Sequence, residues 1–364
     1  MDSRHISAGR LISQGLTGHL PDATSAAPLA AARIVQHLGC VQAQALGGAL
    51  VSIALRAGTS IAAVRGAMDS GHIVRSWTQR GTIHLTTAED LGWILGLTGQ
   101  RTLKSVAKRR EAFGIDDPMV DAAAQLAEDA IRDGGPLTRR ELLNAFEPLQ
   151  AGKEYGHERH LIITLALRNI IVQGPMVEGR DDMKYVLAAD WIPKPVELDA
   201  EAALHEWMRR YVLSHGPVTI DDAARWTALP KTPVRRAIAE AVSAGEIVTV
   251  GIDDREHFQA PDLEDCLHDS QPQADQLLLL PGFDEMILGY KDRSATVDPV
   301  HEKLVVPGGN GMFKNTLIDR ARARATWKRS PRRTGPLLTI EPFAGEPVDV
   351  ERAEAVAASH PAFT

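Results

Sequence analysis

The sequence predicts an α+β protein in which three tandem winged-helix modules precede a small C-terminal antiparallel β-barrel. Helices followed by a pair of strands occur three times along the chain. After Gln271, short strands separated by proline and glycine replace this pattern, which favours a small barrel. The length of 364 residues agrees, because one compact core rarely extends over so many.

Changes in this pattern set the expected domain boundaries. We expect a first winged helix at 1–90, a helical linker at 91–134, a second winged helix at 135–195, a third at 196–262, and a β-barrel with a basic hairpin and a C-terminal helix at 263–364. The similarity among the modules is one of structural pattern, and the first module is the most diverged.

The first module begins with apolar residues at helical spacing between residues 6 and 20. A second helix starts at Pro28 and stops at Gly39, and further helices are expected around 48–56 and from Thr59 onward. The segment IVRSWTQRGTIHLTT then alternates polar and apolar residues and predicts a pair of strands. Within it we expect SWTQRGTIHL to be extended, with Arg80 and His84 on its polar face.

The second and third modules open alike. Gly135–Pro136 introduces LTRRELLNAF, in which Thr138 and Glu141 form a capping-box pattern, and Gly216–Pro217 introduces VTIDDAARWTAL. Each is followed by a second amphipathic helix and a hairpin. The two prolines lie 81 residues apart in the sequence.

The C-terminal region supplies the expected barrel strands. QLLLLPGFDEMILGY predicts a strand, a turn and a second strand, and the segments MFKNTLIDRARARATWKR and GPLLTIEPF predict more. A short helix is expected at 350–359.

Composition excludes several classes of protein. No run of 18 apolar residues exists, so no membrane span is expected, and the polar segment 1–10 lacks the apolar core of an export signal. Cys40 and Cys266 are too few for a disulfide framework or a cysteine zinc site, which suits a reducing cytoplasm. We find no phosphate-binding loop and no clustered histidines, and therefore expect no cofactor and no metal.

Charge is distributed unevenly. The net charge is −7, but residues 301–335 hold nine Lys and Arg against two acidic residues. This segment either attracts a polyanion or forms a solvated basic tail. A second basic group, Arg101, Lys104 and Lys108, occupies one face of a predicted helix, where a purely solvated face is the alternative.

Gln42 and Gln44 are the candidate catalytic residues. They flank Ala43 just beyond a helix end, in an otherwise apolar segment. Side chains two apart in extended backbone point the same way, so both amides can converge on one ligand. An amide does not titrate as an ordinary base, but it can orient a water or hydrogen-bond a base edge. The alternative is that both amides satisfy backbone groups at a helix junction.

Four segments together resemble the AlkZ-like winged-helix DNA glycosylases. They are VQAQ, RSWTQRGTIHL, LLPGFDEMILGYKDR and GMFKNTLIDRARARATWKR, and the resemblance covers about residues 6–345. It implies three winged helices in a C-shaped arrangement plus a β-barrel, and excision of alkylated bases, including interstrand crosslinks. It also implies that Gln42 and Gln44 match the Gln-x-Gln motif of one branch, whereas a sister branch has Gln-x-Asp.

The resemblance further implies a barrel hairpin that enters the DNA minor groove. TLIDRARARATW matches it best, with a turn near Asp319–Ala321, although this chain has Asp-Arg where the family commonly has Asp-Gly. With this hairpin and the features above, the expected DNA-binding residues are Arg320, Arg322, Arg324, Lys328, Arg329, Arg101, Lys104, Lys108, Arg80, His84 and Arg293.

We therefore expect a monofunctional glycosylase that acts, as a monomer associated with the nucleoid of a bacterium, on double-stranded DNA carrying a cationic alkylated purine. Gln42 and Gln44 are expected to hold the hydrolytic water. A winged-helix DNA-binding protein without catalysis, such as a transcriptional regulator, is the main alternative, and an interaction scaffold is another. The sequence leaves open which lesion is excised and whether the base is flipped.

Overall fold

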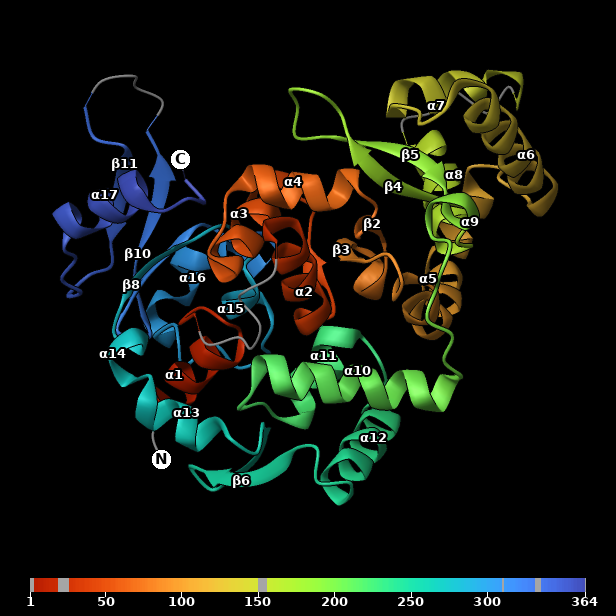
Figure 1. Ribbon diagram of the computed structural model, residues 1–364. Coiled ribbons are helices and arrows are strands. Elements are labelled where there is room, and N and C mark those ends of the chain that lie inside the picture. Colours follow the sequence, from red (N-terminus) through yellow and green to blue (C-terminus); the bar gives the residue numbers. More distant parts are fainter. Residues whose placement is uncertain (1–2, 19–25, 150–155, 310, 331–334, 364) are drawn as a thin grey trace. The chain divides into compact units, whose positions relative to one another are not determined.

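The computed structural model describes residues 3–18, 26–149, 156–309, 311–330 and 335–363 (Figure 1). The chain divides into two compact units. One comprises residues 1–64 and 204–364, and the other comprises residues 65–203. These units cut across the expected modules, because the hairpin of the first module belongs to the second unit. The module boundaries remain a prediction.

The first unit contains the candidate catalytic residues Gln42 and Gln44. Its N-terminal elements are α1 (Ser3–Ser13), α2 (Ala27–Leu38), β1 (Val41–Gln42), α3 (Leu46–Ala57) and the start of α4 (Ile61–Asp69). Its central elements are α10 (Ala200–His215), whose first turn precedes the unit boundary, α11 (Ile220–Thr227), α12 (Lys231–Ser243), β6 (Val248–Ile252), β7 (Arg255–Gln259), α13 (Leu263–Asp269) and α14 (Gln271–Ala274). Its C-terminal elements are β8 (Leu277–Leu280), α15 (Glu285–Leu288), η3 (Pro299–His301), α16 (Glu302–Val305), η4 (Pro307–Gly309), β9 (Thr316–Asp319), β10 (Arg322–Arg329), β11 (Leu338–Pro342) and α17 (Val350–Ser359).

Helix α11 and the β6–β7 hairpin form as the sequence predicts. Thr219 caps α11, and its side chain exchanges hydrogen bonds with Asp222 in a capping box. Strands β6 and β7 pair from Val248↔Gln259 to Ile252↔Arg255. A two-residue turn joins them at Asp253–Asp254, and both residues have positive φ, as a type I′ turn requires.

The C-terminal sheet is open, in contrast to the predicted barrel. Its order is β11–β10–β9–β8, and no closed barrel is found in the described part of the chain. The apolar run of β8 explains the difference. Leu277 and Leu279 face a layer that includes α17, which lies beside the sheet in Figure 1, whereas Leu278 and Leu280 face residues of α1 and α15. Helices cover both faces of the sheet, so its apolar side chains are buried without the sheet closing into a barrel.

A second prediction for this region is also wrong. Residues 285–288 of the predicted second strand form the short helix α15. Asp284 begins it by accepting a hydrogen bond from the Met286 N–H at 2.9 Å, and this N-cap favours a helical turn over a strand.

The second unit combines a helical layer with an antiparallel sheet. Its elements are α4 (Ile61–Asp69, in part), β2 (Ile73–Trp77), η1 (Gln79–Gly81), β3 (Ile83–Thr87), α5 (Leu91–Ala112), α6 (Asp117–Gly134), α7 (Arg139–Ala145), η2 (Glu147–Leu149), α8 (His157–Leu167), β4 (Ile171–Met176), β5 (Met183–Leu187) and α9 (Ala188–Trp191). The sheet order within the unit is β3–β2–β4–β5. The two expected hairpins thus share one sheet, joined where Arg75 pairs with Gln173.

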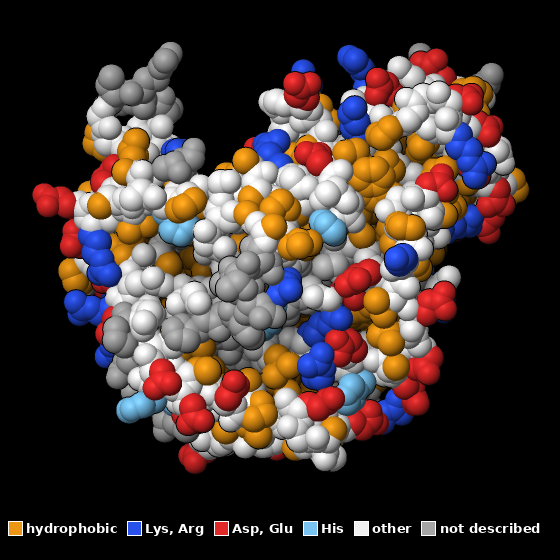
Figure 2. All heavy atoms as spheres, viewed as in Figure 1, with side chains coloured by type: hydrophobic (Ala, Val, Ile, Leu, Met, Phe, Trp, Pro, Cys, Tyr) orange, Lys and Arg blue, Asp and Glu red, His pale blue; other side chains and the backbone are white. Residues whose placement is uncertain are grey.

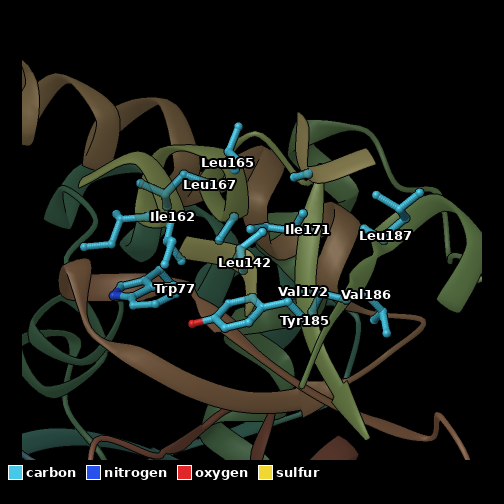
Figure 3. Packing of buried hydrophobic residues seen from close by; sticks show 14 of the residues in the cluster. Trp77, Leu142, Ile162, Leu165, Leu167, Ile171, Val172, Tyr185, Val186 and Leu187 are labelled. Carbon is cyan, nitrogen blue, oxygen red and sulfur yellow. The ribbon is translucent and has the colours of Figure 1, made fainter. Parts of the chain in front are cut away.

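One buried cluster holds the helices of this unit to the sheet. Figure 3 shows Leu142 of α7 and Ile162 of α8 beside Trp77 and Tyr185 from the strands. The capping box of Thr138 and Glu141 starts α7 as predicted. Burying aromatic and aliphatic side chains of this size contributes about 1.5–3 kcal/mol each to folding.

The expected continuous strand through residues 76–84 is interrupted. Strands β2 and β3 pair from Ile73↔Thr87 to Trp77↔Ile83, and η1 forms the turn between them. Arg80 and Gly81 have φ of 56° and 65°, a left-handed conformation that ends the extended backbone. The predicted pair of strands is therefore confirmed, but the alternating faces stop at this turn.

Candidate active site and nucleic-acid interface

The segment with the two glutamines joins β1 to helix α3. The Gln42 side chain is buried, whereas Gln44 and Ala45 are exposed. Nε2 of Gln42 donates a hydrogen bond to Oε1 of Gln44 at 2.9 Å. The two amides therefore meet each other, and Gln44 is the member of the pair that a solute reaches.

The Glu285 carboxylate lies next to the backbone of Gln42. The backbone N–H of Gln42 donates to Oε1 of Glu285 at 3.4 Å, and the indole N–H of Trp226 donates to Oε2 at 2.9 Å. Nε2 of His215 lies 3.5 Å from the same Oε2. The carboxylate is 0% exposed, so these groups replace its solvent shell.

His215 is uncharged near neutral pH. Its burial lowers its pKa, and this effect outweighs the opposing effect of the Glu285 carboxylate. Nδ1 of His215 lies 2.8 Å from Oγ of Ser214, and the ring stacks on Tyr211 with centroids 4.6 Å apart. The imidazole is thus held as part of an aromatic layer under the glutamine segment.

Asp284, next to Glu285, has a different partner. Arg56 of α3 donates to both carboxylate oxygens of Asp284, at 2.8 and 2.9 Å, and Oγ of Ser52 adds a third hydrogen bond at 2.7 Å. Burial alone raises the pKa of Asp284, but the charge and hydrogen bonds of Arg56 and the bond from Ser52 hold it below its ordinary value. This ion pair ties the helix after the glutamines to the loop before α15.

The backbone before Asp284 is under strain. Phe283 has φ of 65°, which is rare for a bulky residue, and its ring packs against Phe313 with centroids 5.8 Å apart. Gly282 is required here, because a Cβ would lie 2.6 Å from the Phe313 carbonyl oxygen. This turn directs Asp284 and Glu285 into the protein interior.

The sequence alone did not reveal the roles of Asp284, Glu285 and Arg56. A signal was present, since two adjacent acidic residues stand inside the apolar segment LLLLPGFDEMILGY. Acidic residues in such a run require buried partners. The partners lie 228 and 243 residues away in sequence, which no local pattern reveals.

The basic face predicted from residues 101–108 is present on α5. Arg101, Lys104 and Lys108 are all exposed and lie one helical turn or two apart. Exposed cations at this spacing can each contact a phosphate. Their role in DNA binding remains a prediction.

Arg80 and His84 form a unit at the η1 turn. His84 is 0% exposed, so it offers no surface to DNA in this conformation. Nδ1 of His84 donates to the Thr82 carbonyl oxygen at 3.1 Å, and Nε2 accepts from the Arg80 guanidinium at 3.1 Å. Burial, assisted by the Arg80 charge, holds the pKa of His84 well below its ordinary value. His84 thus orients Arg80, and only the arginine reaches the surface.

Several of the predicted DNA-binding arginines are engaged within the protein. Arg322 donates to the carbonyl oxygens of Ser294 and Ala295, and Arg324 forms an ion pair with Glu346. Arg293 binds Glu302 at 2.9 Å and the Ile287 carbonyl oxygen at 2.8 Å. These partners satisfy part of the donor capacity that DNA contacts would use.

The predicted hairpin turn between Asp319 and Arg322 is confirmed. Arg320 and Ala321 have φ of 51° and 60°, so a two-residue type I′ turn forms without glycine. Ala321 is nevertheless 1% exposed, and Oγ of Ser7 donates to its carbonyl oxygen. Much of this tip is packed within the first unit. Arg320 is exposed at the turn, and Lys328 and Arg329 are exposed at the other end of β10.

The charges of both signs are mixed on the surface. In Figure 2, Lys and Arg side chains stand among Asp and Glu side chains on the described part of the face.

Within the described residues, no group of three or more His, Cys, Asp and Glu side chains is arranged to hold a metal ion. In the same part of the chain, no single helix is long and apolar enough to cross a membrane. Helices α3 and α4 together reach the required length and apolarity but are bent by 106°.

Comparisons with known proteins identify the family of this chain and its fold. The family model described as DNA glycosylase AlkZ-like matches residues 35–363. An interstrand DNA cross-link repair glycosylase of Streptomyces sahachiroi is 26% identical over 317 residues, which are 82% of each chain. The solved structure of Streptomyces sahachiroi DNA glycosylase AlkZ is similar in fold, with a TM-score of 0.77 at 23% identity, and the match covers 98% of this chain and 95% of that one. The family match over most of the chain shows that this protein belongs to the AlkZ-like DNA glycosylase family.

Proposed function

We propose that this chain is a monofunctional DNA glycosylase that hydrolyses the N-glycosidic bond of cationic N-alkylated purines in double-stranded DNA. The observation that carries the proposal is the fixed amide pair. Gln44 is exposed, Gln42 holds its oxygen at 2.9 Å, and Glu285 holds the Gln42 backbone. On this motif we assign the chain to the Gln-x-Gln branch of the family, as part of the proposal.

The chemistry of a cationic purine suits neutral amides. A guanine alkylated at N7 carries a positive charge, so its bond to C1′ breaks with the electron pair returning to the base. The base leaves neutral, water adds to C1′, and one proton is released to solvent. No general acid is needed, and the enzyme has to stabilise the oxocarbenium-like sugar and orient the water. The Gln44 carbonyl oxygen, with one lone pair facing Gln42, has a second with which to accept from that water.

The substrate class extends, in our proposal, to bulky adducts and interstrand crosslinks. The support is the similarity to the relative named as an interstrand DNA cross-link repair glycosylase. We further propose that the protein acts as a monomer and needs no cofactor.

DNA contacts are proposed at the basic residues that remain exposed. These are Arg101, Lys104 and Lys108 on α5, and Arg320, Lys328 and Arg329 of the β9–β10 hairpin. We add the half-buried turn residue Arg80. Arg293, Arg322 and Arg324 are half-buried and have partners within the protein, so we expect them to contribute less to DNA binding. Arg329 also donates to the Phe363 carbonyl oxygen, at 2.6 Å, but remains exposed.

Base release from a defined duplex tests the proposal. Purified protein is incubated with a duplex containing one N7-methylguanine and, separately, with an interstrand crosslink between guanines. Chromatography then detects the free base, and alkali detects abasic sites. We expect release of the neutral base and strand breaks only after alkali. A protein that binds DNA and leaves a footprint but releases no base would instead be a DNA-binding protein without catalysis.

A further inference from the structure

Glu285 is a buried carboxylate whose charge is not neutralised by an arginine or a lysine. Within the described residues, His215 is the one basic side chain that lies within 4.0 Å of its oxygens. Its neighbour Asp284 differs, because Arg56 pairs with both of its oxygens. Burying a carboxylate without a cation is costly and is usually avoided, so its retention suggests a role.

Both oxygens of Glu285 face hydrogen-bond donors. Gln42 donates its backbone N–H at Oε1 and Trp226 donates its indole N–H at Oε2, so each oxygen accepts a hydrogen bond from the protein. These donors are neutral, so they stabilise the carboxylate without cancelling its charge. Burial lowers the pKa of His215, which leaves the ring uncharged at neutral pH.

The Glu285 carboxylate lies next to Gln42 of the candidate catalytic pair. Oε1 of Glu285 lies 3.4 Å from the Gln42 nitrogen, and the Gln42 side chain binds Gln44. All three residues belong to the first compact unit. Because Glu285 is 0% exposed, water screens its field weakly on the protein side.

We propose that Glu285 is a positioning residue of the glycosylase site that also favours positive charge on the substrate sugar. It fixes the backbone of Gln42, and its negative charge stabilises the oxocarbenium-like sugar that forms beside Gln44. The neutral Gln-x-Gln pair thereby gains the favourable electrostatics that a carboxylate in the motif would provide. This inference rests on the proposed function, since it assumes that a cationic sugar forms at this site.

Binding to two abasic-site analogues tests the role of the charge. One duplex contains a pyrrolidine in place of the sugar, which is cationic at neutral pH, and the other contains the neutral tetrahydrofuran. The ratio of the two Kd values isolates the preference for positive charge from general DNA affinity. We expect the wild type to prefer the cation and the preference of Glu285→Gln to be smaller by about tenfold or more. A structural role alone would weaken binding to both duplexes and leave the ratio unchanged.

Two further variants complete the design. Glu240→Gln removes one exposed carboxylate on α12 and changes the net charge equally, so its ratio should equal that of the wild type. Glu285→Asp keeps the charge but withdraws it by one methylene, and we expect an intermediate ratio. Thermal unfolding identifies which variants are folded.

The outcomes separate this inference from the proposed function. A ratio equal to that of the wild type in folded Glu285→Gln, which lacks the charge, overturns the inference, as does a wild type that binds both analogues equally. A wild type that prefers the cation but releases no base from N7-methylguanine DNA contradicts the proposed function and leaves the electrostatic role of Glu285 supported.

Discussion

Arg56 and Asp284 form a two-point ion pair that is fully buried. The guanidinium of Arg56 donates from Nη1 to Oδ2 at 2.8 Å and from Nη2 to Oδ1 at 2.9 Å, and both side chains are 0% exposed. Bidentate geometry of this kind gives strong, directional hydrogen bonds. The pair connects α3, which follows the glutamine segment, to the turn that carries Glu285.

Breaking this pair should destabilise the protein strongly. We expect Asp284→Asn to lower the free energy of unfolding by about 3–5 kcal/mol, because the buried Arg56 charge loses its counter-charge. Chemical denaturation measures the loss. The matched control is Asp319→Asn, which breaks the exposed pair of Asp319 with Arg352 and should change stability by about 1 kcal/mol or less. Similar losses for both variants would contradict the assignment of Asp284 as a structural anchor.

The basic face of α5 should account for part of the salt dependence of DNA binding. Replacing Arg101, Lys104 and Lys108 together with glutamine removes three exposed cations. If each contacts one phosphate, the slope of log K against log salt concentration should fall by about 3. Titrations of a fluorescent duplex at several salt concentrations measure this slope. The control is Arg324→Gln, whose cation is paired with Glu346 and should change the slope less. An unchanged slope in the triple variant would show that this face is merely solvated.

Arg80 and His84 should act as one unit in DNA binding. The Nε2 acceptor of His84 orients the Arg80 guanidinium, so His84→Ala should weaken duplex binding about as much as Arg80→Ala. The double variant should then lose no more than either single one. Equilibrium Kd values of the wild type, the two alanine variants and the double variant on one duplex measure this coupling. His84→Gln, which keeps an acceptor, should lose less. Fully additive effects would mean that His84 does not position Arg80.

His37 should make stability depend on pH in the acidic range. Burial lowers the pKa of His37 to about 4, although its hydrogen bond to the Ser13 carbonyl oxygen opposes the shift. The unfolded chain binds this proton near pH 6.5, so between about pH 6.5 and 4 the unfolded state holds a proton that the folded state lacks. Stability is therefore full above pH 6.5 and falls as the pH is lowered through this window.

The variant His37→Gln isolates this contribution. Relative to the variant, we expect the wild type to lose about 1–3 kcal/mol of unfolding free energy between pH 7 and pH 4.5, measured by urea denaturation. A parallel pH dependence in both proteins would rule out His37 as the source.

Local sequence signals predicted local structure well. The capping pairs Thr138–Glu141 and Thr219–Asp222 start the helices expected of them, and the turn near Arg320 lies where predicted. These features depend on residues within four positions of one another, so a single sequence contains the information.

Features that depend on long-range burial were not predictable in the same way. The apolar segment 277–290 gives no sign whether helices or further strands cover it, and so the open sheet and α15 were missed. The role of Glu285 depends on Gln42 and Trp226, which are distant in sequence. The glutamine pair itself was found by its spacing, but only the structure shows that one amide is buried and holds the other.

Single-turnover excision of N7-methylguanine by Gln44→Ala shows whether the exposed amide takes part in hydrolysis. With enzyme in excess, we expect release about 100-fold slower than with the wild type, because the water loses its orienting amide. Duplex affinity should stay within about threefold, and Gln125→Ala, an exposed glutamine on α6, should match the wild type. A wild-type rate in the folded Gln44→Ala variant would exclude the Gln44 amide from the mechanism.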